Sequence, residues 1–327
     1  MSEHLEKNSK CIVITTINQK NDCLSGFAEI KGWDLIIVGD KKSPQTYDLK
    51  AFYLDVGEQQ KLFSEFAESL PYNHYCRKNL GYAYAIAQGY KVIGESDDDN
   101  LPKTGWGNIS EESVFPTITA PAYPNVYREF TDQNIWPRGF PLDLLVAEEK
   151  ARKTTMPANV GVWQGLADGD TDVDAIYRLT INKNVKFTPD KAVVLDSGIV
   201  SPFNSQNTIW QKKAFAYLYL PHTVTFRYTD ILRSFVAQFG LWSLGLRLGF
   251  ISPTVSSDVR NYHNYLKDFA DEVPMYNTFH TVMETLKGCK LTGNSEDLFV
   301  MYEALFNKGI VQKSELDTIR IWLKLIS

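Results

Sequence analysis

Short runs of β-branched and apolar residues alternate with longer amphipathic stretches over the first hundred residues. The apolar runs are KCIVITTIN at 10–18, WDLIIVGD at 33–40 and AFYLDV at 51–56. Runs of this kind that end in polar residues are typical of buried strands. The segments 57–71 and 77–90 have apolar residues at helical spacing; Pro71 ends the first, and Gly89 lies near the end of the second. The pattern predicts an α/β protein built from βαβ units with a parallel sheet.

The next apolar run, KVIGESDDDN at 91–100, ends in three consecutive aspartates. Adjacent carboxylates repel one another unless a cation or hydrogen-bond donors compensate them. Alternate residues of a strand point the same way, so Asp97 and Asp99 are expected on one side and Asp98 on the other. This is the geometry of a D-x-D site for Mg²⁺ or Mn²⁺ at a strand end, where ligands of open α/β sheets bind. The alternative is a solvated acidic turn.

Periodicity is weaker in the middle of the chain, where 101–230 mixes short apolar runs with Pro, Gly, Asn and Trp. We expect this segment to be irregular and to build a site or a lid. It contains a second acidic group, ADGDTDVDAIYRL at 167–179, in which Val173 and Leu179 stand where an EF-hand needs Gly and Glu. That group is therefore interpreted as a polar turn or as a loop that meets the substrate. Helical periodicity returns near the C-terminus.

Composition narrows the class of protein. The 327 residues are 44% hydrophobic and 22% charged, which is ordinary for a globular protein, and the net charge of −5 argues against nucleic acid as a partner. The cysteines have no metal-ligand spacing, so we expect reduced thiols; they are Cys11, Cys23, Cys76 and Cys289. No apolar run approaches the ~20 residues that span a bilayer. We expect a cytoplasmic protein without a transmembrane segment, and a peripheral position at the inner face of the membrane stays open.

Several motifs, in this order, resemble those of a known family: ITTIN, IIVGDKKSP, RKNLGYAYAIAQG, ESDDDN, WPRGFPL, DGDTDVDAIYRL, SPFNSQNTIW and LPHTVTFRYTDILRSFVAQ. Together they resemble the STELLO family of glycosyltransferase-like proteins. They are more distantly similar to the plant reversibly glycosylated polypeptides, which act as UDP-arabinopyranose mutases. The resemblance covers about residues 10–270. It implies a GT-A fold, a Rossmann-like mixed sheet flanked by helices, with a D-x-D metal site and a nucleotide-sugar donor. The membrane anchor of the plant proteins has no counterpart in this sequence, which favours a soluble, microbial relative.

The resemblance also implies roles for individual residues. The residues expected to bind the nucleotide and its phosphates are Thr15, Thr16, Asn18, Asp40, Lys41, Arg77, Asp98 and Arg138. Asp97 and Asp99 are expected to hold the metal, with His263 as a further ligand from the C-terminal part. Lys41 and Arg77 each have an alternative as a surface charge. His263 has one as a structural histidine, and Arg138 as an arginine that bridges two loops.

The segment RYTDI at 227–231 resembles an Arg-Tyr-Asp-Asp stretch of the mutase-like proteins, with Thr229 in place of one aspartate. Asp230 is our first choice for the base that deprotonates the acceptor hydroxyl, followed by Asp172 and Asp174, with Asp170 as a further alternative. Asp230 also fits the N-cap of a helix at 231–239. A retaining enzyme would need no such base.

The function predicted from the resemblance is transfer of a sugar from a nucleotide-sugar, with UDP as the expected carrier, to a glycan or lipid-linked acceptor. Mn²⁺ or Mg²⁺ is the expected cofactor. We expect a nucleotide-sugar-binding and catalytic domain at 1–250 and a mainly helical C-terminal extension at 251–327. The alternatives are a UDP-sugar mutase and a non-catalytic scaffold of the same fold. The sequence leaves the oligomeric state open.

Overall fold

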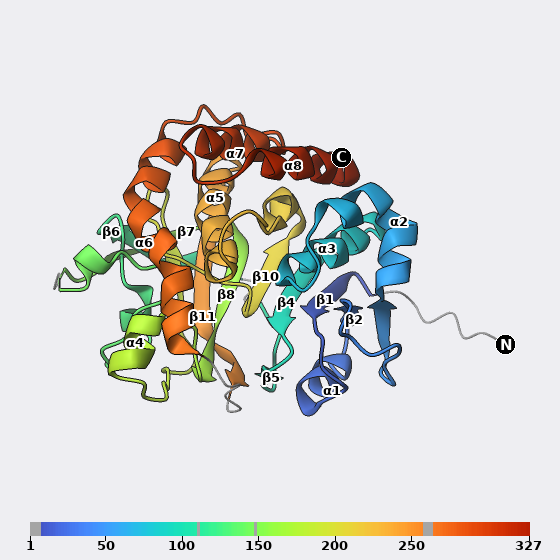
Figure 1. The fold of residues 1–327 in the computed structure, drawn as a ribbon. Helices are drawn as coiled ribbons and strands as arrows, with labels where there is room; N and C mark the ends of the chain where they lie inside the picture. Colours follow the sequence, from blue (N-terminus) through green and yellow to red (C-terminus); the bar gives the residue numbers. More distant parts are fainter. Residues whose placement is uncertain (1–7, 110–111, 147–148, 258–263) are drawn as a thin grey trace.

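The computed structural model describes residues 8–109, 112–146, 149–257 and 264–327. This part of the chain folds around one mixed sheet of 11 strands in the order β3-β2-β1-β4-β10-β8-β11-β9-β6-β7, with β5 paired to β11 (Figure 1). The strands are β1 (Lys10–Thr15), β2 (Asp34–Val38), β3 (Ala51–Leu54), β4 (Val92–Asp97), β5 (Leu101–Pro102), β6 (Val114–Ala120), β7 (Arg152–Pro157), β8 (Val160–Gly169), β9 (Ala192–Leu195), β10 (Asn207–Gln211) and β11 (Arg247–Ser257).

Strands β3, β2, β1 and β4 form the parallel half that the sequence predicts. Their connections include α1 (Asp22–Ala28), α2 (Val56–Ser69) and α3 (Lys78–Ala87). Because the strands are parallel, their carboxyl ends meet at one edge, and Thr15 lies in register with both Val38 and Asp97. The strand pattern of the sequence therefore brings the aspartates next to the end of β1.

The other half of the sheet is formed largely by the segment 101–230, and there the expectation of an irregular segment is wrong. Strand β10 pairs antiparallel with both β4 and β8, and β11 pairs parallel with β8. Most of β8 is buried, so it lacks the alternation of apolar and polar residues that marks a half-exposed strand. The strands β9 and β10 have only four and five residues, so they leave little periodic signal.

Helices cover the sheet and form most of the C-terminal part, as the sequence predicts. These helices are α4 (Ala175–Thr180), α5 (Thr229–Ser243), α6 (Tyr265–Lys287), α7 (Asp297–Asn307) and α8 (Lys313–Ile326), with 3₁₀ helices η1 (Tyr75–Arg77), η2 (Val126–Glu129), η3 (Leu142–Leu144), η4 (Lys212–Leu218) and η5 (Phe226–Tyr228). Helix α8 returns to the N-terminal half and packs on α2 and α3, where Trp322 contacts Phe66 (Figure 1). The mixed sheet with flanking helices and a helical C-terminal part confirms the predicted fold class.

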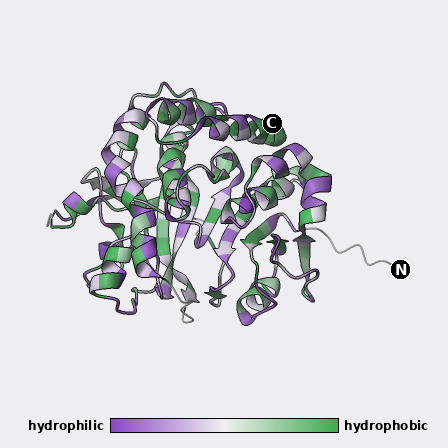
Figure 2. Ribbon diagram, viewed as in Figure 1, coloured by the Kyte–Doolittle hydropathy of each residue, from purple (hydrophilic) through white to green (hydrophobic). Residues whose placement is uncertain are grey.

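Hydropathy follows this arrangement. Figure 2 shows hydrophobic residues along the central strands, whereas the helices carry both hydrophobic and hydrophilic residues. The predicted domain boundary between residues 250 and 251 falls inside β11, and the division into two domains stays a prediction.

Within the described residues, no helix has both the length and the apolar character needed to cross a bilayer.

Close packing of α3 on the sheet depends on Gly81. A Cβ atom at this position would lie 2.6 Å from Val38 Cγ2 and closer still to Val13 Cγ1, and both valines are buried strand residues. We expect Gly81→Val to lower the free energy of unfolding by about 1 to 3 kcal/mol, measured by urea denaturation, because a packed core does not yield to added volume. Gly288→Val is the matched control, since the nearest atom to its Cβ is a backbone oxygen at 3.4 Å. Equal losses in both variants would contradict the packing argument.

Candidate active site

Two adjoining clefts lie at the carboxyl ends of β1, β2 and β4. The first, the aspartate cleft, has a volume of about 360 Å³, and the second, the strand-end cleft, has about 250 Å³. They share four lining residues, Thr15, Tyr75, Asp98 and Phe226. The charged lining of the aspartate cleft consists of Asp97, Asp98, Asp99, Arg138, Asp170, Asp172, Arg178, Arg227 and Asp230. These charged residues come from four separate stretches of the chain, at 97–99, 138, 170–178 and 227–230, which converge on this one cleft.

The three consecutive aspartates have different partners. Asp97 Oδ1 accepts a hydrogen bond of 3.0 Å from Lys78 Nζ, whose side chain is fully buried. Asp98 Oδ2 accepts a hydrogen bond of 2.8 Å from Asn18 Nδ2 and another from the Thr16 hydroxyl. Asp98 therefore ties β4 to the segment after β1, whereas Asp97 is paired with a cation from α3.

Negative charge is in excess at the end of β4. Desolvation, followed by the charges of Asp97 and Asp98, raises the pKa of Asp99 to about 7. Desolvation also raises the pKa of Asp97, and the Lys78 ammonium opposes this effect. The Asp97 side chain keeps 43% of its surface exposed, so we expect desolvation to act on it less than on a fully buried carboxylate. A cation bound here would favour the charged forms of both groups.

The donor set at this strand end fits a hard divalent cation that shares its coordination with a ligand. Among the residues that the structure describes, no group of three or more His, Cys, Asp and Glu side chains is arranged to hold a metal ion by itself. Mg²⁺ is usually held by one or two carboxylates, with water and substrate phosphates completing its shell. Asp97 and Asp99 can supply those carboxylates. His263, the predicted third ligand, lies outside the described residues.

Arg138 bridges two of the predicted catalytic aspartates. Its Nε and Nη2 bond to Asp172 at 2.8 and 2.9 Å, and its Nη1 and Nη2 bond to Asp230 at 3.0 Å each. The residue is 5% exposed. The structure therefore places Arg138 as a bridge between the loop before α4 and the first turn of α5, which is the alternative left open by the sequence.

Asp230 is held on both carboxylate oxygens. Desolvation would raise the pKa of Asp230, but the ion pair with Arg138 outweighs it and lowers the pKa to about 2. The predicted N-cap role is wrong: α5 begins at Thr229, because η5 runs directly into it, and Asp230 lies inside the first turn. Its side chain accepts from the Ser205 N–H at 3.2 Å rather than from the helix. A carboxylate that is ion-paired and has so low a pKa is a weak base.

The other candidate bases differ in position. Asp174 is fully buried, caps α4, and accepts hydrogen bonds from Tyr177 N–H, Trp136 Nε1 and Tyr276 Oη at 2.6 to 2.8 Å. It does not belong to the lining of either cleft. Asp172 lines the aspartate cleft, where Asn204 Nδ2 also donates to it at 2.9 Å. Asp170 pairs with Arg178 on the same wall.

The strand-end cleft contains Thr15, Thr16, Asn18 and Asp40, as the resemblance implies. Asp40 Oδ2 accepts from the Asn73 N–H at 2.7 Å, so two residues of this lining are hydrogen-bonded to each other.

The two basic residues predicted to meet a phosphate are placed differently. Arg77 lines the cleft, but its guanidinium is buried and donates to Gln59 Oε1 and to the Leu70 carbonyl. Lys41 Nζ lies 3.9 Å from the centre of the Tyr72 ring and is outside the lining of either cleft. Arg77 is therefore held by hydrogen bonds inside the protein, and Lys41 contacts an aromatic ring at the surface.

Sequence reasoning missed the buried Lys78 and an aromatic cluster at the junction of the clefts. His74 and Tyr75 are stacked at 5.4 Å with an interplanar angle of 9°, and the Phe226 ring lies 4.6 Å from that of Tyr75. Phe226 is 49% exposed. Lys78 is the first residue of α3, and a lysine at the start of a helix does not by itself indicate burial. Phe226 lies far from β4 in the sequence, and no local pattern marks it.

Comparisons with known proteins agree with the resemblance. A family model described as STELLO glycosyltransferases matches residues 227–326. The chain is 28% identical over 279 residues to the probable glycosyltransferase STELLO2 of Arabidopsis thaliana, and 27% identical over 271 residues to STELLO1 of the same plant. Each match covers 76% of this chain, but only 36% and 35% of the relatives. The chain therefore spans about a third of the length of these curated proteins.

Among solved structures, the fold is similar to glucosyl-3-phosphoglycerate synthase from Mycobacterium tuberculosis in complex with Mn²⁺ and uridine-diphosphate-glucose. The TM-score is 0.41 and the identity is 8%, and the match covers 84% of this chain and 78% of that one. The sequence matches carry the conclusion on their own: they confirm that this chain resembles the STELLO glycosyltransferases, over 76% of its length and in its C-terminal part in particular.

Proposed function

We propose that this chain is a metal-dependent glycosyltransferase of GT-A type that transfers a sugar from a UDP-sugar to a glycan or lipid-linked acceptor. One observation carries the proposal: the strand-end cleft at the ends of β1 and β2 adjoins a cleft with three consecutive aspartates, and the two share Thr15 and Asp98. A nucleoside in the first cleft would extend its diphosphate toward the second. The similarity to the STELLO glycosyltransferases supports the same reaction class.

Residues of both clefts have separate tasks in this proposal. Thr15, Thr16, Asn18 and Asp40 border the nucleoside, and the aromatic cluster of His74, Tyr75 and Phe226 offers a stacking surface for its base.

The diphosphate would lie beside Asp97 and Asp99, which would hold Mn²⁺ or Mg²⁺. The metal would supply stabilisation of the negative charge on the leaving diphosphate. Lys78 holds Asp97 in place through the hydrogen bond to Oδ1.

The acceptor hydroxyl needs a base if the reaction inverts the anomeric centre. Asp230 stays our candidate, since it lines the aspartate cleft. Both of its oxygens are held by Arg138 in this state, so the proposal requires that this pair opens when the donor binds. The donor diphosphate is a competing bidentate partner for the guanidinium.

A thermal-shift experiment tests the donor and the metal together. We expect UDP-sugars to raise the melting temperature by about 2 °C or more in the presence of Mn²⁺ and to leave it unchanged in excess chelator, because only a ligand that binds the native state stabilises it. GDP-sugars with the same sugar are the control for recognition of the uracil ring. A shift that is independent of metal, or no shift with any UDP-sugar, would contradict the proposal. Isomerisation of the bound UDP-sugar without release of UDP would assign the mutase reaction instead.

A further inference from the structure

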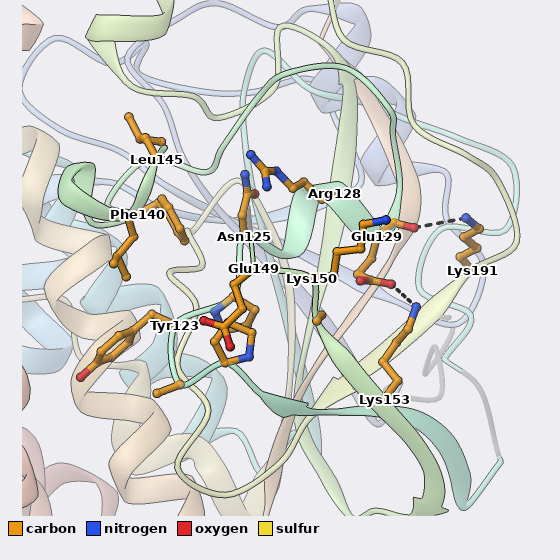
Figure 3. Close-up of a pocket in the computed structure, with 15 residues that line it drawn as sticks. Tyr123, Asn125, Arg128, Glu129, Phe140, Leu145, Glu149, Lys150, Lys153 and Lys191 are labelled. Atoms are coloured by element: carbon orange, nitrogen blue, oxygen red, sulfur yellow. Dashed lines mark hydrogen bonds and ion pairs between the residues drawn. The ribbon is translucent and has the colours of Figure 1, made fainter. Parts of the chain in front are cut away.

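A third hollow, here called the basic pocket, lies apart from both clefts and shares no lining residue with them. It has a volume of about 870 Å³. It is formed by the segment around η2, the segment from Phe140 through η3, the start of β7, and Lys191 (Figure 3).

One wall of the basic pocket is positively charged. Four cationic side chains line it against two acidic ones; they are Arg128, Lys150, Lys153, Lys191, Glu129 and Glu149. Glu129 is already engaged, since its carboxylate pairs with Lys153 and its carbonyl accepts from Lys191 Nζ at 3.2 Å. Within the described part of the chain, Arg128 and Lys150 are exposed and form no ion pair. Counting Glu149 as well, the lining therefore carries two more cationic groups than carboxylates, and Arg128 and Lys150 are held in no described ion pair.

The opposite wall is apolar. In Figure 3, Phe140, Leu145 and Tyr123 lie on one side of the pocket, and Lys153 and Lys191 lie on the other. Phe140 is buried, and the Tyr123 ring is fixed by an edge contact to Phe279 at 5.2 Å. Val146, which follows Leu145 directly, is 89% exposed. An aliphatic side chain so exposed beside an apolar wall extends the surface that a ligand could cover.

We infer that the basic pocket binds an amphiphilic phosphate ester, with the phosphoryl group on Arg128 and Lys150 and the apolar chain along Phe140, Leu145 and Val146. A guanidinium binds phosphate oxygens in a bidentate manner, and an ammonium adds a point charge beside it. Contact between the chain and the apolar wall adds binding free energy for each methylene group removed from water. A free alkyl phosphate and the headgroup of an anionic lipid share this chemistry. The aromatic residues of the lining, Tyr123 and Phe140, lie opposite Lys153 and Lys191 and do not alternate with these cations, as they would in a site for single-stranded nucleic acid.

Octyl phosphate below its critical micelle concentration is the probe for a free ligand, titrated by calorimetry. We expect it to bind at least tenfold more tightly than inorganic phosphate, because the octyl chain adds contact with the apolar wall. The double variant Arg128→Ser/Lys150→Ser should weaken its binding at least tenfold with an unchanged melting temperature, since both residues are exposed. Lys213→Ser/Lys308→Ser removes the same charge elsewhere on the surface and should change binding less than twofold.

Vesicles of phosphatidylcholine with and without phosphatidic acid distinguish the source of the ligand. If the protein binds the acidic vesicles and the variant Arg128→Ser/Lys150→Ser does not, the ligand is a lipid headgroup. If the protein binds only octyl phosphate, the ligand is a free amphiphile. Both outcomes support the inference. It is overturned if neither probe binds, if inorganic phosphate binds as tightly as octyl phosphate, or if the control double variant weakens binding equally. Asp99→Asn should leave this binding unchanged, so the result is independent of the catalytic proposal.

Discussion

Replacement of Arg138 by methionine is expected to lower the free energy of unfolding by about 3 to 5 kcal/mol, because it leaves two buried carboxylates without their cation. The side chains of Asp172 and Asp230 are only 10% and 5% exposed, and each bonds to the guanidinium twice. Methionine fills part of the volume of the arginine but supplies no hydrogen-bond donor. Urea denaturation at pH 7, followed by circular dichroism, measures the loss.

The triple variant Arg138→Met/Asp172→Asn/Asp230→Asn is the control. It removes both uncompensated charges, so we expect it to recover most of the stability that Arg138→Met loses. A triple variant no more stable than the single one would mean that the arginine acts through packing rather than through its charge.

The pH dependence gives a second check with a defined sign. The ion pair lowers the pKa of Asp230 from 3.8 to about 2, so its contribution to wild-type stability is present above pH 4 and is lost as the pH falls toward 2. In Arg138→Met the same carboxylate is buried without a partner, so its protonation on acidification should stabilise the variant. The difference between the two proteins should therefore narrow from pH 7 to pH 3. A constant difference would contradict the ion-pair explanation.

The parallel half of the sheet was predictable because its signals are local. Strands β1, β2 and β3 are short runs rich in β-branched, aliphatic or aromatic residues, β4 begins with Val92 and Ile93, and helical periodicity separates β3 from β4. The three aspartates mark a strand end by themselves, since no buried strand continues through consecutive charges.

The second half of the sheet was not predictable in the same way, because its order is set by contacts between distant segments. Strand β8 lies between β10 and β11, and its parallel partner β11 begins nearly eighty residues after it ends. A mostly buried strand such as β8 shows an apolar run without period. Tertiary packing, rather than local preference, assigns such runs to strands.

The same distinction between local signals and long-range contacts applies to the candidate site. The aspartates at the end of β4 and the polar residues at the end of β1 follow from strand ends, and the structure brings them together through Asp98. The bridge from Arg138 to Asp230 joins residues 92 positions apart, so the sequence alone gave only two alternatives for it. Lys78 was missed because a buried lysine looks like any other helix residue until its partner is known.

Replacement of Asp99 by asparagine is expected to reduce turnover of the UDP-sugar on the order of 100-fold or more, with loss of Mn²⁺ binding, because it removes one of the two carboxylates proposed to hold the metal. The fold should persist, since the substitution removes a charge that Asp97 and Asp98 repel. Release of UDP measures turnover, using the donor that gives the thermal shift, and calorimetry measures the affinity for Mn²⁺. Full turnover in Asp99→Asn, or in wild-type protein with excess chelator, would contradict the metal-dependent mechanism.

Asp98→Asn is the matched control, one residue away with the same change in charge. An asparagine oxygen can still accept the hydrogen bonds of Asn18 and Thr16, so the link between β4 and β1 should survive and the affinity for Mn²⁺ should change far less than in Asp99→Asn. The predicted alternation of strand side chains does not extend over all three aspartates, because β4 ends at Asp97, Asp98 and Asp99 lie in the turn after it, and all three line the aspartate cleft. The contrast therefore tests which carboxylates bind the cation. If Asp98→Asn alone abolished metal binding, Asp98 would be a ligand and the assignment of the metal to Asp97 and Asp99 would be wrong. If both variants lost binding equally, the cation would be held by the total negative charge of the cleft rather than by particular oxygens.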